Sequence, residues 1–178
     1  GSQPEESFRV DGDAPPWGVG GPLRRARPDE AETLTDLAQR AKRHWGYPEE
    51  WIAVWRPLLT LTPAYIDRHE VVVAAASGAP LGFHALEPPG DGSGLWSLAH
   101  LWVDPDLLGR GLGRRLFAHA VGAVRAAGGR GLVIESDPHA VGFYERLGAR
   151  RSGSVPAPMA GDPDRTLPVL TLTWGPGR

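Results

Sequence analysis

Residues 95–116 read LWSLAHLWVDPDLLGRGLGRRL, and this stretch carries the strongest structural signal of the chain. An apolar run halts at Asp104-Pro105, and a glycine-rich loop then opens a helix. The loop contains three glycines, Gly109, Gly111 and Gly113. Glycine tolerates backbone angles that turn successive N–H groups inward, and a helix N-terminus carries partial positive charge. Three arginines add full charges: Arg110, Arg114 and Arg115. The stretch therefore predicts a strand, a phosphate-binding loop and a helix.

Two common phosphate motifs do not fit this loop. A dinucleotide-binding fingerprint requires glycine where Arg114 stands, and a nucleoside-triphosphate loop requires Gly-Lys before Ser or Thr, which the chain lacks. Charge-assisted hydrogen bonds contribute roughly 1.5–3 kcal/mol each. A few backbone amides and one arginine therefore suffice to hold a pyrophosphate against water.

Residues 108–113 resemble a signature of the GNAT superfamily of acyl-CoA-dependent N-acyltransferases, Arg/Gln-x-x-Gly-x-Gly/Ala after a strand. Leu108 stands where the family has Arg or Gln, which weakens the implied hold on the pyrophosphate. A second block, residues 134–149, resembles the family's strand and Asn-x-x-Ala-x-x-Phe-Tyr helix, with Asp137 in place of Asn. Both blocks occur in the family's order and spacing, and the likeness extends more loosely from residue 23 to residue 174.

The resemblance implies that acetyl-CoA is the co-substrate. It also implies which residues bind that molecule: Leu101, Trp102, Val103, Leu108, Gly109, Arg110, Gly111, Leu112, Gly113, Arg114, Asp137, Ala140 and Phe143. No metal is expected, because the chain has no cysteine and its histidines show no i, i+4 pair with a carboxylate partner.

Two residues are the catalytic candidates. The resemblance places Tyr144 beside the coenzyme sulfur as proton donor, and the alternative is a packed aromatic residue. Glu135 ends a predicted central strand, where a carboxylate can accept a proton directly or through water, or can instead cap the following helix. The family's usual base positions correspond to Ser97 and Ala99, which cannot accept the proton. Alternation points His100 with Leu98 and Trp102 to the opposite face, as a structural histidine.

The resemblance places part of the acceptor site at the junction of the first two helices. The candidate acceptor-binding residues there are His44, Trp45 and Tyr47, whereas Trp51 is expected to pack on the sheet. Arg165, before the last strand, is a candidate partner for an acceptor carboxylate or, alternatively, one solvated arginine among many.

Apolar periodicity and turn residues predict the remaining elements. Strands are expected over residues 23–27, 71–76, 81–86, 95–103, 131–135, 150–155 and 167–174. Helices are expected over about residues 28–44, from 48 to near 57, and over 109–127 and 138–147. Pro57 is expected to limit the second helix. The predicted fold class is α/β: a single-domain GNAT fold with a mixed, mostly antiparallel central sheet of about seven strands and about four flanking helices.

Composition favours one domain over residues 22–175, preceded by a flexible segment over residues 1–21 that is rich in Pro, Gly and acidic residues. A net charge of −2 gives no broad attraction to nucleic acid or to an anionic membrane. No apolar run approaches the roughly 20 residues that span a bilayer. A cytoplasmic protein with a small-molecule partner is expected, and a homodimer stays open.

The combined expectation is an N-acetyltransferase that transfers an acetyl group from acetyl-CoA to the amine of a small molecule, by direct attack in a ternary complex. Three alternatives stay open. They are an acyl-CoA sensor without turnover, an acetyltransferase acting on protein side chains, and transfer to a hydroxyl, thiol or hydrazine-like nitrogen.

Overall fold

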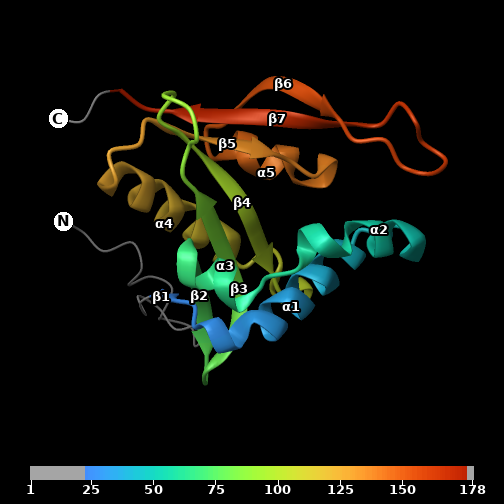
Figure 1. The fold of residues 1–178 in the computed structure, drawn as a ribbon, viewed down its shortest axis with the longest axis horizontal. Coiled ribbons are helices and arrows are strands. Elements are labelled where there is room, and N and C mark those ends of the chain that lie inside the picture. Colours follow the sequence, from blue (N-terminus) through green and yellow to red (C-terminus); the bar gives the residue numbers. More distant parts are fainter. Residues whose placement is uncertain (1–22, 176–178) are drawn as a thin grey trace.

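The computed structural model describes residues 23–175. The predicted flexible segment over residues 1–21 lies outside the described residues. The described chain forms a sheet with helices on both faces (Figure 1). None of its helices combines the length and apolar character needed to cross a membrane.

Within residues 23–175 the sheet has seven strands, in the order β1-β2-β3-β4-β5-β7-β6. Their bounds are β1 (Arg24–Arg25), β2 (Glu70–Ala76), β3 (Ala79–Glu87), β4 (Leu95–Val103), β5 (Gly131–Glu135), β6 (Arg150–Pro156) and β7 (Thr166–Thr173). Among these described strands, β4 and β5 pair in parallel, and every other neighbouring pair is antiparallel. The predicted mixed, mostly antiparallel sheet is confirmed.

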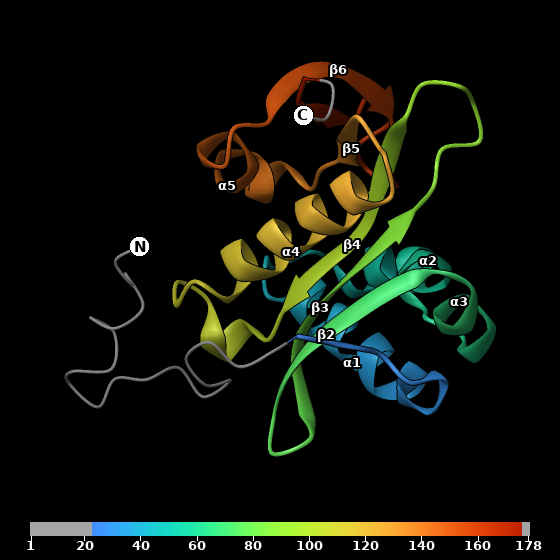
Figure 2. The ribbon, with the colours of Figure 1, turned by 90° about the vertical axis from the view of Figure 1, so that its left-hand side faces the viewer.

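In the described part of the chain, five α-helices cover the sheet: α1 (Ala31–Arg43), α2 (Glu49–Leu59), α3 (Pro63–Arg68), α4 (Leu112–Ala126) and α5 (Val141–Arg146). Helices α1, α2 and α3 pack on one face, whereas α4 and α5 pack on the other (Figure 2). The first face buries Phe83 and Ala85 of β3, and the second buries Leu132 and Ile134 of β5. Two separate apolar layers therefore hold the helices on the sheet.

The helices differ from the prediction in two places. Helix α2 continues through Pro57 to Leu59, because Ile52, Trp55 and Leu59 are buried together on one side and outweigh the missing N–H of proline. The short helix α3 was not predicted. Its start carries a local signal, since Pro63 is its first residue and the Thr62 side chain accepts a hydrogen bond from the Tyr65 N–H.

Strands β4 and β5 pair only at their first three residues, Leu95 to Ser97 with Gly131 to Val133, and then separate. Just beyond this point β4 contains a bulge: Leu98 pairs with Leu86, His100 pairs with Ala85, and Ala99 is the extra residue. One extra residue reverses the alternation of side chains. The expectation that Leu98 and His100 share a face was therefore wrong.

Candidate active site

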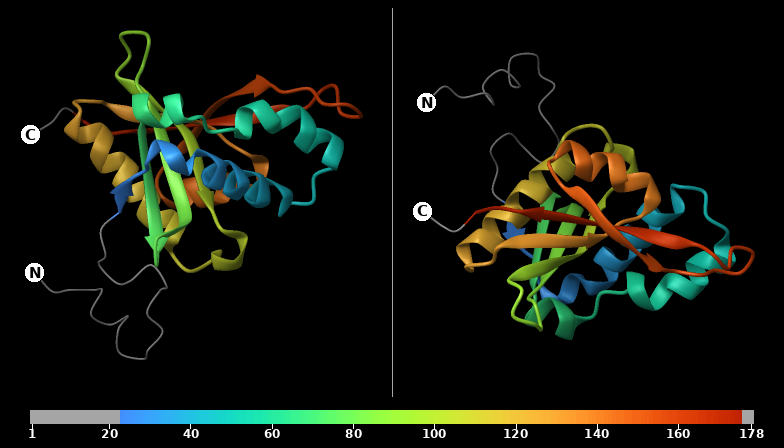
Figure 3. Two further views of the ribbon diagram at one scale, coloured as in Figure 1. Left: turned by 60° about the horizontal axis from the view of Figure 1, so that its bottom comes forward. Right: turned by 90° about the horizontal axis from the view of Figure 1, so that it is seen from above.

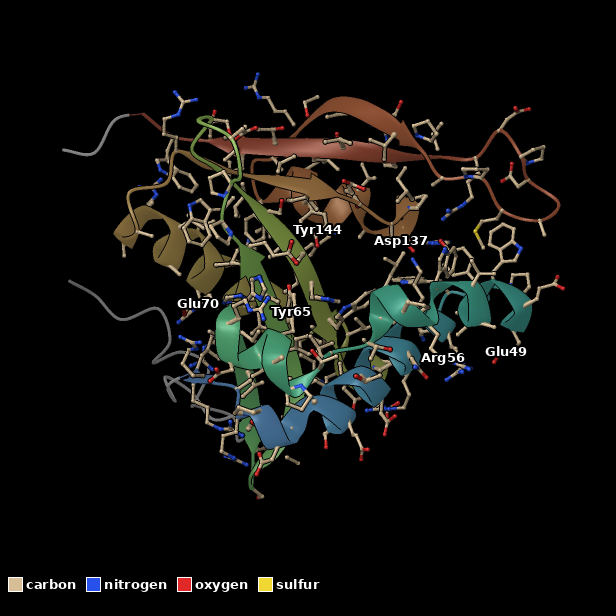
Figure 4. All side chains as sticks on the ribbon, viewed as in Figure 1. Glu49, Arg56, Tyr65, Glu70, Asp137 and Tyr144 are labelled. Carbon is tan, nitrogen blue, oxygen red and sulfur yellow. The ribbon has the colours of Figure 1, made fainter. Side chains whose placement is uncertain are left out.

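A cavity of about 570 Å³ opens where β4 and β5 separate. Its walls come from five segments, namely the α1–α2 junction, β4, the loop before α4 with the first turn of that helix, the end of β5 with the turn after it, and α5. Figure 4 labels Asp137, which follows β5 and lies close to α2, and Tyr144 of α5, which lies nearer to β4. Sixteen of the nineteen predicted site residues line this cavity; the exceptions are Arg110, Tyr47 and Arg165.

The glycine loop forms one end of the cavity and leaves room for an anion. Gly109 and Gly111 have φ angles of 80° and 86°, in the left-handed region that favours glycine. Gly111 precedes α4 and has no side chain to accept from the N–H groups of the first turn. A Cβ at either glycine would meet no atom within 4 Å. These N–H groups and the helix dipole therefore suit a pyrophosphate.

The charged residues of the loop occupy different positions. Arg114 lines the cavity, whereas Arg110 is exposed and does not. Leu108 also lines the cavity, at the place where an Arg or Gln was expected from the resemblance, and is 45% exposed. Backbone amides and Arg114 thus provide the contacts for an anion in this wall.

The open part of β4 forms the middle of the cavity. Every residue from Leu98 to Val103 lines it, and beyond Ser97 the strand has no pairing with β5. Unpaired N–H groups along this edge can donate hydrogen bonds to an extended ligand, as they would to the carbonyl groups of a neighbouring strand. His100 is among the lining residues, and Trp102 Nε1 donates a hydrogen bond to His100 Nδ1 at 2.9 Å. This bond fixes the neutral ring with its proton on Nε2.

Tyr144 lies on α5 in the opposite wall and is 6% exposed. Burial, followed by the negative charge of Asp137, raises the pKa of its hydroxyl. The group therefore stays protonated and able to donate. Glycine at position 113 allows α4 to begin against α5, since a Cβ there would lie 3.3 Å from the Phe143 ring.

Glu135 ends β5 and is exposed to the cavity. The next residue but one, Asp137, is far more enclosed and collects four hydrogen bonds. Its Oδ2 accepts from Lys42 Nζ at 2.6 Å and from Tyr47 OH at 2.9 Å. Its Oδ1 accepts from the His139 N–H at 2.8 Å and faces His139 Nδ1 at 2.9 Å.

The charge state of Asp137 follows from these partners. Burial alone would raise the pKa of this carboxyl, but the hydrogen bond and charge of Lys42 and the donors of His139 hold it below its usual value. The pKa of Lys42 is lowered, chiefly by burial. Asp137 is therefore a firmly ionised carboxylate rather than a proton acceptor.

Aromatic rings surround the part of the cavity that is next to the α1–α2 junction. Trp45 is 39% exposed and stacks on the His139 ring, with 4.8 Å between centroids and 2° between planes. His44 meets Trp45 edge-on at 5.0 Å. All three rings line the cavity.

Tyr47 and Arg165 belong to a cluster outside this lining. The Arg165 guanidinium lies over the rings of Trp55, Trp51 and Tyr47, at 5.1, 5.5 and 5.9 Å. The β6–β7 loop that carries Arg165 extends beside α2 (Figure 3), and Trp51 Nε1 donates to the Ala160 carbonyl at 3.1 Å. Arg165 thus holds this loop on α2.

Sequence reasoning missed two members of the site, Lys42 and His139. Lys42 is the only lysine of the chain and lies four residues after buried Ala38, so its place beside the apolar stripe of α1 was a usable signal. His139 follows Asp137 by two residues. That spacing suits an Asp side chain capping the next turn, but it does not reveal the second bond to the imidazole.

Residues 31–149 match the sequence pattern of the Acetyltransferase (GNAT) family. The chain belongs to this family. Since the match covers both blocks that carry the resemblance, the protein is an acyl-CoA-dependent N-acetyltransferase.

Known relatives of this GNAT protein act on different acceptors. The chain is 28% identical over 161 residues to the peptidyl-lysine N-acetyltransferase YjaB of Salmonella typhimurium strain LT2, covering 85% of this chain and 97% of that protein. It is 42% identical over 66 residues to a blasticidin-S acetyltransferase of Streptomyces morookaense, covering 34% of this chain and 48% of that protein.

The fold also matches a solved structure, that of the PaiA N-acetyltransferase of Thermoplasma acidophilum in complex with coenzyme A. The TM-score is 0.68 at 17% identity, over 86% of this chain and 98% of that one. At such low identity the likeness concerns the fold alone.

Proposed function

We propose that this GNAT protein transfers an acetyl group from acetyl-CoA to the amine of a small molecule, by direct attack in a ternary complex. One observation carries the proposal. A single cavity joins the N-terminus of α4, the open edge of β4, Tyr144 and the aromatic corner formed by Trp45 and His44. Phosphate, thioester and amine sites are thereby continuous, as direct transfer requires.

The two ends of the cavity take different parts of the substrates. The amides of the α4 first turn and Arg114 bind the pyrophosphate. In β4 the N–H of Trp102 faces β3, so Leu101 and Val103 supply the N–H groups that polarise the thioester carbonyl. Asp137, Ala140 and Phe143 line the path between them. Acetyl-CoA supplies the activated acyl group.

Tyr144 donates a proton to the departing thiolate. Its raised pKa keeps the proton on the phenol during binding, and the same enclosed setting penalises a bare thiolate. Proton transfer therefore becomes favourable only as the carbon–sulfur bond breaks.

Glu135 is the exposed carboxylate of the cavity and attracts the ammonium form of the amine. In the proposed mechanism it also takes part in the removal of the amine proton, directly or through water. Trp45 and His44 contact the body of the acceptor, while Tyr47 and Arg165 support that wall from behind.

A peptidyl lysine is the second candidate acceptor. It is favoured by the likeness of this chain to YjaB, which extends over 97% of that protein. The small-molecule acceptor is favoured by the aromatic corner, which suits a compact apolar or aromatic body, and by the likeness to the blasticidin-S enzyme. Both candidates need the same donor site and differ only in what Trp45 contacts.

The test begins with a calorimetric titration of acetyl-CoA, followed by thiol release with a panel of primary amines and with a lysine peptide. Acetyl-CoA binding with release driven by a small amine is the expected result. Thiol release with the lysine peptide alone would make a peptidyl lysine the acceptor in place of a small amine. Absence of acetyl-CoA binding would overturn the proposal. Trp45→Ala should raise the KM of the amine several-fold and leave the Kd of acetyl-CoA unchanged.

A further inference from the structure

His139 and Asp137 form a hydrogen-bonded pair in the wall of the cavity. His139 Nδ1 lies 2.9 Å from Asp137 Oδ1, and the side chains are 43% and 11% exposed. The backbone N–H of His139 donates to the same oxygen at 2.8 Å. Two bonds from one residue therefore set the position of the imidazole relative to the carboxylate.

This contact determines the tautomer of His139. An ionised carboxylate only accepts hydrogen bonds, so Nδ1 must carry a proton in order to bond to it. The neutral ring then has an unprotonated Nε2, whose lone pair can accept a proton. A carboxylate that orients an imidazole in this way also stabilises the imidazolium that forms.

Asp137 is itself held in place and charged. Lys42 Nζ and Tyr47 OH donate to its other oxygen, Oδ2, at 2.6 and 2.9 Å. Burial and the charge of Asp137 raise the pKa of Tyr47 to about 12, so this hydroxyl remains a donor. The carboxylate consequently keeps one oxygen for the imidazole, and it cannot rotate without breaking both donor contacts.

The surroundings of His139 place it on the acceptor side of the site. Its ring lies under Trp45 and meets Tyr47 edge-on, with 5.6 Å between centroids. Several charged or titratable groups lie near it, on neighbouring elements: Asp137, Tyr47, Lys42 beyond Asp137, His44 beyond Trp45, Arg165 over Tyr47, and Glu135 in the same cavity.

We propose that His139 is the general base of the acetyl transfer, with Asp137, Lys42 and Tyr47 as positioning residues. The inference rests on the proposed function and names the group that finally receives the amine proton. The amine nitrogen forms a bond to the acyl carbon, and its proton passes to His139 Nε2, directly or from Glu135 through water. The carbon–sulfur bond breaks, and Tyr144 gives its proton to the sulfur. Solvent then takes the proton from His139 and restores that of Tyr144.

The experiment compares His139→Ala with wild-type protein and with His69→Gln. His69 lies at the end of α3 and does not line the cavity, so His69→Gln serves as the matched histidine control. The amine found in the acceptor screen is used together with a fluorinated, weakly basic analogue that is neutral at the assay pH. The measured quantities are kcat, KM and the calorimetric Kd of acetyl-CoA.

For the basic amine, His139→Ala should lower kcat about 100-fold, while the Kd of acetyl-CoA stays within about twofold. For the weakly basic amine the loss of kcat should be below about tenfold. This amine is already neutral at the assay pH, so it has no ammonium proton to lose before it attacks the acyl carbon. Added imidazole should restore part of the rate that His139→Ala loses.

A retained kcat in His139→Ala, or the same loss for both amines, would overturn the inference and leave the transferase intact. Wild-type protein that turns over no amine would instead overturn the proposed function together with this inference. Nitrogen NMR of the wild-type histidines gives an independent readout, with a protonated Nδ1 and a bare Nε2 expected for His139. The opposite tautomer would also refute the assignment.

Discussion

Nζ of Lys42 lies 2.6 Å from Oδ2 of Asp137, so the only lysine of the chain joins α1 to the turn after β5. The side chains are only 12% and 11% exposed. Lys42 also lies over the Trp55 ring at 4.4 Å. This ion pair connects helix α1 to the segment that carries Asp137, His139 and Tyr144.

Replacing Lys42 by Met should lower the free energy of unfolding by about 3 kcal/mol, because an enclosed carboxylate then loses its main counter-charge. Urea unfolding at pH 7 measures the change. Arg43→Met is the control, since Arg43 pairs with Glu49 at 3.0 Å with side chains 38% and 71% exposed. Its cost should stay below about 1 kcal/mol. Equal costs for the two variants would contradict this account of Asp137.

Tyr144→Phe should lower kcat by about 100-fold or more while the Kd of acetyl-CoA changes little. The change removes one buried hydroxyl and keeps the ring that packs near Phe143 and Phe117. Steady-state kinetics and calorimetry give the two quantities. Equal kcat in the two proteins would remove Tyr144 from its role as proton donor.

Gly111→Glu should weaken acetyl-CoA binding, because it brings a carboxylate into the glycine loop that we propose binds the pyrophosphate. Gly111→Ala is the matched control, since both variants meet the same backbone strain at a φ of 86°. That strain costs about 1–2 kcal/mol of stability. The Glu variant should lose at least about tenfold more affinity than the Ala variant. Equal affinities in two folded variants would argue against this loop as the pyrophosphate site.

Acid should destabilise the fold through buried histidines. Burial, with a smaller contribution from His119, lowers the pKa of His84 to about 3, and burial lowers that of His100 to about 4. An unfolded histidine has a pKa of about 6.5, so below that pH the unfolded chain binds more protons than the folded one. Stability should therefore fall as pH drops from about 6.5 toward 4, by up to about 1.4 kcal/mol per pH unit for each histidine.

The variant His84→Leu isolates one of these two contributions. Its unfolding free energy should depend on pH about half as steeply as that of the wild type between pH 6.5 and 4. Urea unfolding at three pH values in this window measures the slopes. An unchanged slope would mean that His84 is not held neutral in the fold.

Local sequence patterns predicted the helices and strands well where one short stretch of residues is enough to define the element. The residue bounds of β4 and β5 agree with the prediction, because a short apolar run between turn residues indicates a buried strand. Helix α3 was missed because its six residues are too few to show a period. The bulge at Ala99 was missed because it depends on how β4 pairs with β3, which alternation along one strand does not contain.

The sequence by itself determined the fold class, the glycine loop that precedes α4 and the family, because glycine spacing, arginines and apolar runs act over a few neighbouring residues. Tertiary structure alone decided which side chains meet. Lys42 and Asp137 are 95 residues apart, and Arg165 reaches Trp51 from another part of the chain. Such pairs form only when sheet pairing and helix packing bring distant segments together. A pattern within one short segment contains no information on which distant segment will lie beside it.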